Sequence, residues 1–160
     1  MKIAIISDSH DNLPNLKKAV DWIKKEKIKI IIHCGDVSNQ EIFKEALGDY
    51  KGKIYLSRGN CDLGDFDIIP RLKIYDEFGE VSVRNKKVAF THFPKIAGEL
   101  AMKEKYDLVF YGHNHKPWVK TVGKTQLVNP GNLSGVFYKA TFATYDNRAD
   151  KLELKILERL

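Results

Sequence analysis

Short apolar runs alternate with amphipathic segments through the first third of the chain. Buried strands are predicted at residues 2–7, 29–34 and 53–57, because each segment is dominated by a run of apolar side chains. A segment beginning near Leu13 and a second segment around residues 42–47 repeat apolar side chains with helical spacing. This order of strands and helices predicts parallel strands joined by helical crossovers.

The remainder of the chain contains more strands and fewer helices. Three strands joined by hairpins are predicted at residues 71–78, 80–85 and 87–92. A helix at residues 96–105 and a strand at 107–112 follow. Four more short strands are predicted at residues 118–122, 125–129, 137–145 and 151–157. The pattern predicts a mixed α/β protein with two sheets, in a single domain that spans residues 1–160.

Composition excludes several classes of protein. Two cysteines among 160 residues are too few for a disulfide framework, which suits a reducing cytoplasm. We expect neither a signal peptide nor a membrane-spanning segment, since no apolar run is long enough. The formal net charge is +6, but the lysines are scattered along the chain. A solvated basic surface is therefore predicted, with no membrane partner and no clear nucleic-acid surface.

Side chains that can bind metals follow the ends of five predicted strands. They are Asp8 and His10, then Asp36, then Asn60, then His92, and finally His113 and His115. Because ligands bind outside the carboxyl ends of strands in open α/β sheets, we expect these side chains to converge. Each one alone could be a helix cap or a turn residue. A shared metal site accounts for all of them together, whereas His33 lies inside a strand and is expected in the core.

The candidate ligands also indicate the kind of metal. Seven of them exceed the needs of one four-coordinate ion, so two ions are predicted. Imidazole and carboxylate donors suit a borderline divalent metal, with Mn as the first candidate and Ni, Co, Fe or Zn as alternatives. Two such ions activate a shared water for in-line attack at phosphorus. A small phosphoester is therefore the expected substrate.

The same segments resemble a known family. "DSH", "GDVSN", "GNCD", "TH" and "GHNH" are similar, in order and in strand context, to the five signature motifs of the calcineurin-like metallophosphoesterases. "VNPGN" resembles the small single-domain phosphodiesterase branch of bacteria and archaea. The resemblance covers essentially the whole chain. It implies a four-layer α/β/β/α sandwich, in which two mixed sheets are flanked by helices.

The resemblance also implies a role for each motif residue. One metal would be held by Asp8, His10, Asp36 and His115. The other would be held by Asp36, Asn60, His92 and His113, so that Asp36 bridges the two ions. Asp36, Asn60 and His92 are accordingly the expected catalytic residues. The implied activity is hydrolysis of phosphodiester P–O bonds by a metal-bridging hydroxide.

One position departs from the family pattern. Many members have His after the Asn of the third motif, where it helps to protonate the leaving group or contacts the phosphate, but this chain has Cys61. A thiol is a poor substitute for an imidazolium at neutral pH. Asp62 is expected to orient neighbouring groups. Asn12 and Arg58 are candidate substrate contacts, with a helix cap and simple exposure as their respective alternatives.

Other functions stay open at this stage. A phosphomonoesterase or a small nuclease could use the same metal site. A non-enzymatic scaffold is the alternative of a different class, because a eukaryotic sorting-complex subunit shares this fold with an incomplete metal site. Here all seven ligand positions are filled, which favours an enzyme. A homodimer is an open alternative to a monomer.

Overall fold

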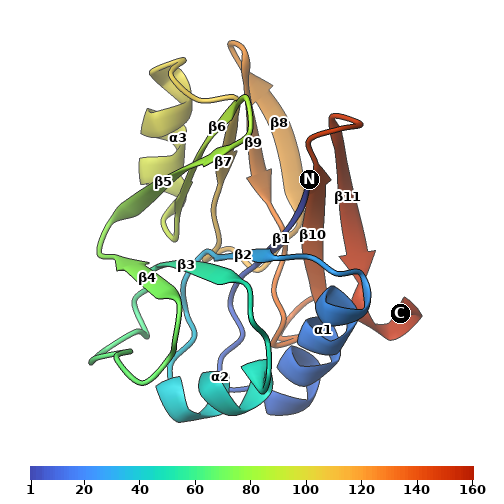
Figure 1. Cartoon of the computed structure of the whole chain (residues 1–160). Helices are drawn as coiled ribbons and strands as arrows, with labels where there is room; N and C mark the ends of the chain where they lie inside the picture. The colour runs from blue at the N-terminus through green and yellow to red at the C-terminus, as the bar shows by residue number, and fades with distance from the viewer.

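The computed structural model describes residues 1–160, which form two β-sheets and three α-helices (Figure 1). In chain order the elements are β1 (Lys2–Ile6), α1 (Leu13–Lys25), β2 (Ile30–His33), α2 (Gln40–Leu47), β3 (Lys53–Ser57), β4 (Leu72–Tyr75), β5 (Phe78–Val83), β6 (Lys86–Thr91), α3 (Pro94–Met102), β7 (Leu108–Phe110), β8 (Trp118–Val122), β9 (Thr125–Asn129), β10 (Thr141–Asp146) and β11 (Lys151–Ile156). A 3-10 turn, Leu157–Arg159, ends the chain. No helix is both long and apolar enough to cross a membrane.

The two sheets pack face to face between helical layers. The first sheet has the strand order β11-β10-β1-β2-β3-β4, and the second has the order β5-β6-β7-β9-β8. In Figure 1, α1 and α2 cover the first sheet and α3 covers the second. Leu16 and Phe43 belong to the core under α1 and α2, Ile5 and Phe90 to the core between the sheets, and Leu100 to the core under α3. The predicted four-layer α/β/β/α sandwich is confirmed.

Local sequence signals set the helix boundaries. The Asn12 side chain accepts a hydrogen bond from the backbone of the first turn of α1, which also contains Pro14. Asn39 caps α2 in the same way, and Gly48 follows the last residue of α2 with a φ of 53°, a value that favours glycine. The third helix begins at Pro94, slightly earlier than predicted. Proline suits this position because the first turn of a helix leaves its N–H groups unpaired.

The register places the ends of several parallel strands at one edge. Ile5 pairs with Ile32, which pairs with Tyr55, so that β1, β2 and β3 are parallel as predicted. In the second sheet Ala89 pairs with Val109, which makes β6 and β7 parallel. The carboxyl ends of parallel strands meet at the same edge of a sheet. The segments that follow these strands can therefore meet.

Two predicted strand arrangements were wrong. β4 does not form a hairpin with β5, because Leu56 of β3 pairs in parallel with Ile74 of β4 in the first sheet. Ile74 packs on the core of that sheet, and the chain then crosses to the second sheet. The strand predicted at residues 137–145 starts only at Thr141. Phe137 has a φ of 65°, a left-handed conformation that a strand cannot contain.

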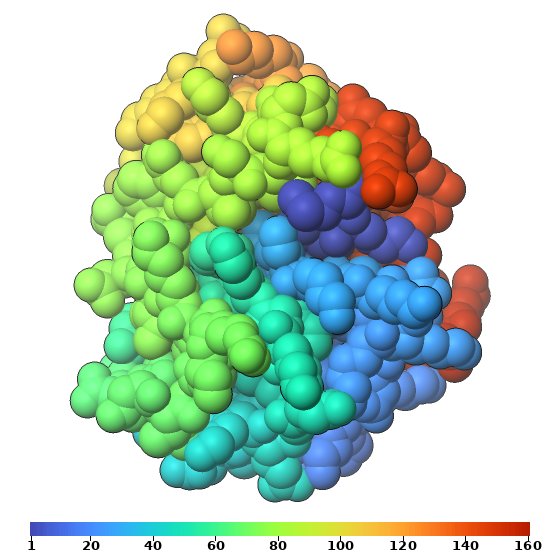
Figure 2. Space-filling view, viewed as in Figure 1, coloured from blue at the N-terminus to red at the C-terminus, as the bar shows by residue number.

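The start of β1 lies beside a hollow of mixed charge. Figure 2 shows the N-terminal residues at the surface, between the segment near the β5–β6 turn and the C-terminal strands. The hollow is lined by Met1, Lys2, Glu26, Lys27, Lys29, Arg84, Asp146 and Arg148. Lys2 pairs with Glu26 at 3.1 Å, and the N-terminal ammonium pairs with Asp146 at 3.5 Å. The hollow lies at the start of β1, whereas the predicted ligands follow the end of this strand.

Candidate metal centre

The seven predicted ligands come together where the edges of the two sheets meet. Asp8 and His10 follow β1, Asp36 follows β2, Asn60 follows β3, His92 follows β6, and His113 and His115 follow β7. Strands of both sheets contribute, since β6 and β7 belong to the second sheet and the others to the first. The donor atoms form two sets that share one carboxylate.

The first set contains one carboxylate and two imidazoles. His10 Nε2 lies 3.2 Å from His115 Nε2. Asp8 Oδ1 lies 3.4 Å from His115 Nε2 and 3.9 Å from His10 Nε2. The Asp8 side chain is fully buried and accepts hydrogen bonds from the Ser7 hydroxyl and from the backbone N–H of His113. These bonds fix the orientation of the carboxylate toward the two histidines.

The second set contains two imidazoles and an amide oxygen. His92 Nε2 and His113 Nδ1 lie 3.1 Å apart, and each lies 3.1 Å from Asn60 Oδ1. His92 Nδ1 lies 2.8 Å from the backbone oxygen of Cys34, an acceptor only, so this nitrogen donates. In the neutral ring, Nε2 therefore presents its lone pair to Asn60 and His113.

Asp36 lies between the two sets. Its Oδ2 is 3.6 Å from His10 Nε2 in the first set and 3.5 Å from His92 Nε2 in the second. Its Oδ1 accepts a hydrogen bond of 2.9 Å from the backbone N–H of Cys61. One oxygen of Asp36 is thus held by the backbone, and the other faces histidines of both sets.

The chemistry of the donor set fits divalent cations. Neutral imidazole nitrogens and carbonyl oxygens face one another, and lone pairs at such distances need a proton or a cation between them. The ion-pair contacts of Asp8 and Asp36 are all with histidines. Burial lowers the pKa of His92 and of His115, which favours the neutral rings that metals require. Burial also raises the pKa of Asp8 to about 7, although the hydrogen bond from Ser7 opposes this shift.

Unusual backbone conformations aim the side chains at the centre. Asp8, His10, Asp36, His113 and His115 have φ angles of 50°, 41°, 58°, 72° and 58°. Residues other than glycine seldom adopt this left-handed region, and such strain clusters at functional sites. The surrounding structure must hold each of these residues in its strained conformation. The strain is therefore concentrated at the predicted metal centre.

Asp62 holds two of the loops together. Its buried carboxylate accepts four backbone hydrogen bonds of 2.7–2.9 Å. The donors are the N–H groups of Asp36, Val37, Ser38 and Gly59. The loop that carries Asp36 is therefore fixed to the loop that precedes Asn60. The orienting role of Asp62 expected from the sequence stays a prediction.

The contacts of Asn12 and Arg58 are with neighbouring loops. Asn12 Nδ2 donates to the backbone oxygen of Ser134 at 2.9 Å, while its oxygen caps α1. Arg58 Nη1 donates to the backbone oxygens of Asp62 and Gly64 at 3.1 and 2.6 Å. Both side chains brace the loops around the centre. Substrate contact stays a prediction for both.

Cys61 lies nearer to the predicted ligands than its sequence position alone indicates. Its Sγ and donor atoms of His10 and Asp36 all lie within 4.8 Å of one another. Sγ also accepts a hydrogen bond of 3.3 Å from Asn60 Nδ2. Burial raises the pKa of the thiol, and the charge of Asp36 adds to this shift. The thiol therefore keeps its proton at neutral pH beside these carboxylates.

The "VNPGN" segment supports the loop that carries His113 and His115. Asn129 Nδ2 donates to the backbone oxygen of Gly112 at 3.0 Å, and Asn132 Nδ2 donates to that of His115 at 3.0 Å. Both asparagines are buried, which turn chemistry alone does not require. A Cβ at Gly112 would meet Ser7, Asp8 and Cys34, so the chain can pass there only as glycine.

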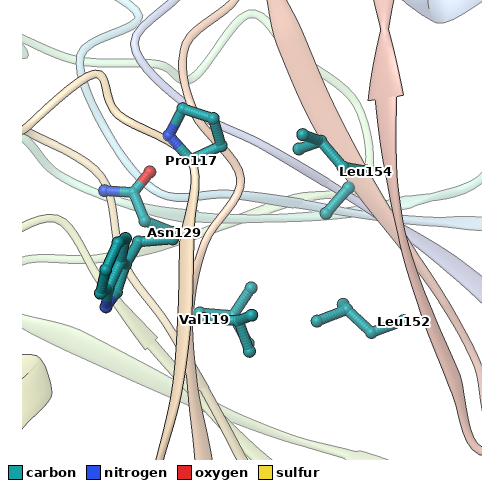
Figure 3. A pocket seen from close by; sticks show the side chains of 8 residues that line it. Pro117, Val119, Asn129, Leu152 and Leu154 are labelled. Atoms are coloured by element: carbon teal, nitrogen blue, oxygen red, sulfur yellow. The ribbon is translucent and has the colours of Figure 1, made fainter.

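Two other features lie outside the donor sets. His33 is fully buried and its Nε2 lies 3.2 Å from the Ser9 hydroxyl, as expected for a core histidine. An apolar groove of about 400 Å³ lies between β8 and β11, lined by Pro117, Trp118, Val119, Val128, Asn129, Ala143, Leu152 and Leu154 (Figure 3). Its lining contains no carboxylate and no imidazole, so it offers no catalytic group.

Comparisons with known proteins identify the family of this chain. The family model of the calcineurin-like phosphoesterase superfamily domain matches residues 1–150. Phosphodiesterase MJ0936 of Methanocaldococcus jannaschii is 34% identical over 143 residues, covering 84% of this chain and 86% of that protein. A solved structure described as a novel archaeal phosphodiesterase superposes with a TM-score of 0.85 and 31% identity, covering 98% of this chain and 99% of the other.

More distant structures share the fold. Wild-type Vps29 of Entamoeba histolytica, crystallised with zinc, superposes with a TM-score of 0.71 at 18% identity, covering 96% of this chain and 90% of the other. At this identity the likeness shows the fold alone. The family match over residues 1–150 and the archaeal relative go further. The chain belongs to the calcineurin-like phosphoesterase superfamily.

Proposed function

We propose that the protein is a metal-dependent phosphodiesterase that uses two divalent ions. The observation that carries the proposal is Asp36, whose Oδ2 lies 3.6 Å from His10 of one donor set and 3.5 Å from His92 of the other. Asp8, His10 and His115 would complete the first site, and Asn60, His92 and His113 the second. Imidazole and carboxylate donors suit Mn first, with Ni, Co, Fe or Zn as alternatives.

The chain's own residues orient the reaction. When bound, the ions would lower the pKa of water and polarise the phosphoester. Asp36 keeps the two sites at a fixed separation, because Asp62 and Cys61 hold its backbone and its second oxygen. The backbone oxygen of Cys34 accepts a hydrogen bond from His92 Nδ1 and so fixes the tautomer of this ring. The lone pair of Nε2 therefore stays available for a metal ion.

The diester preference rests on relatives. A relative named a phosphodiesterase is 34% identical to this chain, and the solved structure described as an archaeal phosphodiesterase is 31% identical. The main alternative is a non-enzymatic scaffold, in which the site would have no chemical task. A scaffold has no need to keep two buried carboxylates beside four imidazoles, with five of these six residues at positive φ. The strained donor set therefore favours the enzyme.

Metal reconstitution tests the proposal. The protein is stripped with a chelator and then assayed with bis(p-nitrophenyl) phosphate and with p-nitrophenyl phosphate, with Mn, Ni, Co, Fe, Zn or no metal added. We expect no hydrolysis without metal and faster hydrolysis of the diester with Mn. Full activity in metal-free protein, or no activity with any of the metals, would refute the proposal.

Variants of a single loop supply the control. His113→Ala and His115→Ala should each lose most activity. Asn114→Ala should keep it, because Asn114 lies between these histidines and its side chain is exposed. Equal loss in all three variants would show that the assay reports only disruption of the loop.

Three further expectations belong with this proposal. We propose a small phosphoester as the substrate, since two ions held by these donor sets would act at phosphorus. Cytoplasmic location, which the sequence favours, and a homodimer, which the sequence leaves open, both stay predictions. Sedimentation velocity would decide between a monomer and a dimer.

A further inference from the structure

Aromatic side chains lie on two sides of the donor sets. The Phe93 ring packs against His92 and His113, with centroids 5.0 and 5.8 Å away. The Phe137 ring lies on the other side, 6.1 Å from the ring of His115. Phe93 is partly buried, whereas Phe137 is 89% exposed. Phe137 therefore offers a free aromatic surface beside the first set.

The conformation of Phe137 has no structural explanation. Its φ of 65° lies in the left-handed region, where a bulky side chain is strained. At 89% exposure, the ring gains little from packing against the protein. Val136 and Tyr138 on either side are also exposed, at 44% and 45%. Strain without compensating burial is a feature of functional positions.

Asn132 connects this loop to the donor sets. Its buried side chain donates to the backbone oxygen of His115 and accepts hydrogen bonds from the backbone N–H groups of Gly135 and Val136. The backbone N–H of Ser134 donates to the backbone oxygen of Asp8 at 3.0 Å. The loop that carries Phe137 is therefore positioned by the same groups that position two predicted ligands.

We propose that Phe137 is a specificity residue, against which a planar aromatic substituent of the phosphoester packs. This inference rests on the proposed function and names its substrate class as aryl or nucleoside phosphoesters. A phosphate held by the donor sets must carry its organic group out past the rim of the site, where Phe137 presents an open ring. A docked protein fits less well, because a stable interface buries about 800 Å² per partner and this patch has three residues.

Equilibrium binding to the metal-loaded protein tests the proposal. The dissociation constants of methylphosphonate and phenylphosphonate are measured by calorimetry. The constant for methylphosphonate divided by that for phenylphosphonate is the phenyl preference, and this ratio isolates the contribution of the aromatic group. Phe137→Ala should reduce this ratio about tenfold, the size expected for one stacked ring. Phe137→Trp should keep the ratio. Met102→Ala, which removes an exposed apolar side chain from α3, should leave it unchanged.

A second pair of probes distinguishes the two sources of the aromatic group. Thymidine 5′-phosphate is compared with 2-deoxyribose 5-phosphate, so that only the nucleobase differs. Loss of preference in the phenyl pair alone indicates an aryl substrate, and loss in both pairs indicates that nucleosides also fit. An unchanged ratio in both pairs overturns the proposal and leaves the loop for another contact, such as a protein surface.

The stability of Phe137→Gly distinguishes a role in specificity from a structural role, because the loss of a structural contact would lower the urea midpoint. Phe137→Gly removes the left-handed strain, so its urea midpoint should rise while the phenyl preference falls. A lower midpoint with an unchanged preference would overturn the proposal. The binding measurements need no turnover. Absence of hydrolysis would therefore refute the phosphodiesterase assignment alone, whereas an unchanged ratio in an active enzyme would refute only the role of Phe137.

Discussion

Replacing Asp62 with asparagine should destabilise the protein strongly, although the side chain keeps its shape. The carboxylate accepts four backbone hydrogen bonds, two on each oxygen. In Asp62→Asn, an amide NH₂ takes the place of one oxygen and faces two N–H donors. Each buried donor left unpaired costs about 1–3 kcal/mol, so the expected loss is about 2–6 kcal/mol. This is a large part of the stability of an ordinary domain, which is about 5–15 kcal/mol.

Urea unfolding of the metal-free protein measures this loss without interference from bound ions. Asp65→Asn is the matched control, because it makes the same chemical change at an exposed position in the same loop. The control should lie within about 0.5 kcal/mol of the wild type. If Asp62→Asn lost less than about 1 kcal/mol, the four hydrogen bonds would not be holding the Asp36 loop, and the reasoning would be refuted.

Four further results are expected. Asp36→Ala should lose both ions by metal analysis, whereas His113→Ala and His115→Ala should each weaken mainly one; equal loss of both ions in all three would indicate a single shared site. Chelation should lower the melting temperature, because ions at 100 times their dissociation constant stabilise each site by about 2.7 kcal/mol; an unchanged temperature would exclude bound ions. Cys61→His should raise kcat/KM for alkyl diesters more than for aryl diesters, by up to about 10²-fold, since the thiol is a slow proton donor; parallel leaving-group plots would contradict this. In metal-free protein, the pKa of Asp8 is about 7, which is above its value in the unfolded chain. The protonated carboxyl therefore contributes its full stability below about pH 4, and this contribution is lost as the pH rises from about 4 to about 7. In urea titrations, the wild type should lose stability over this window relative to Asp8→Asn.

Much of the fold could be predicted because its signals are local. The apolar run of β1, the Asn12 cap and Gly48 each depend on a few neighbouring residues. The pairing of β4 with β3 depends on which core Ile74 joins, and no local pattern contains that information. The delayed start of β10 has a different origin, because the left-handed φ of Phe137 interrupts the strand and no local sequence pattern marks that conformation.

The candidate site shows a similar division. The convergence of Asp8 with Asp36 followed from parallel strands and the rule that their ends share an edge of one sheet. The meeting of Asp8 with His92 also depends on how the two sheets pack, which no local pattern contains. The bracing by Asn129 and Asn132 was missed, because an Asn beside Pro-Gly is typical of an ordinary turn. A signal was present in the pair of asparagines three residues apart, but only their burial gives it meaning. The role of Phe137 could not be predicted, since exposure and φ are properties of the folded chain.

The position of β1 has a consequence for the order in which the protein can be completed during synthesis. All seven predicted ligands precede residue 116, but part of the frame around Asp8 comes later, from the backbone N–H groups of Leu133 and Ser134, which bond Ser7 and Asp8, and from the pairing of β1 with β10. Chains emerge from the ribosome N-terminus first. The nascent chain therefore displays all the predicted ligands while part of the frame that fixes their geometry is still being made. During that interval any ion that enters meets flexible side chains rather than a shaped site. The last quarter of the chain thus decides when the geometry of the predicted metal centre is complete.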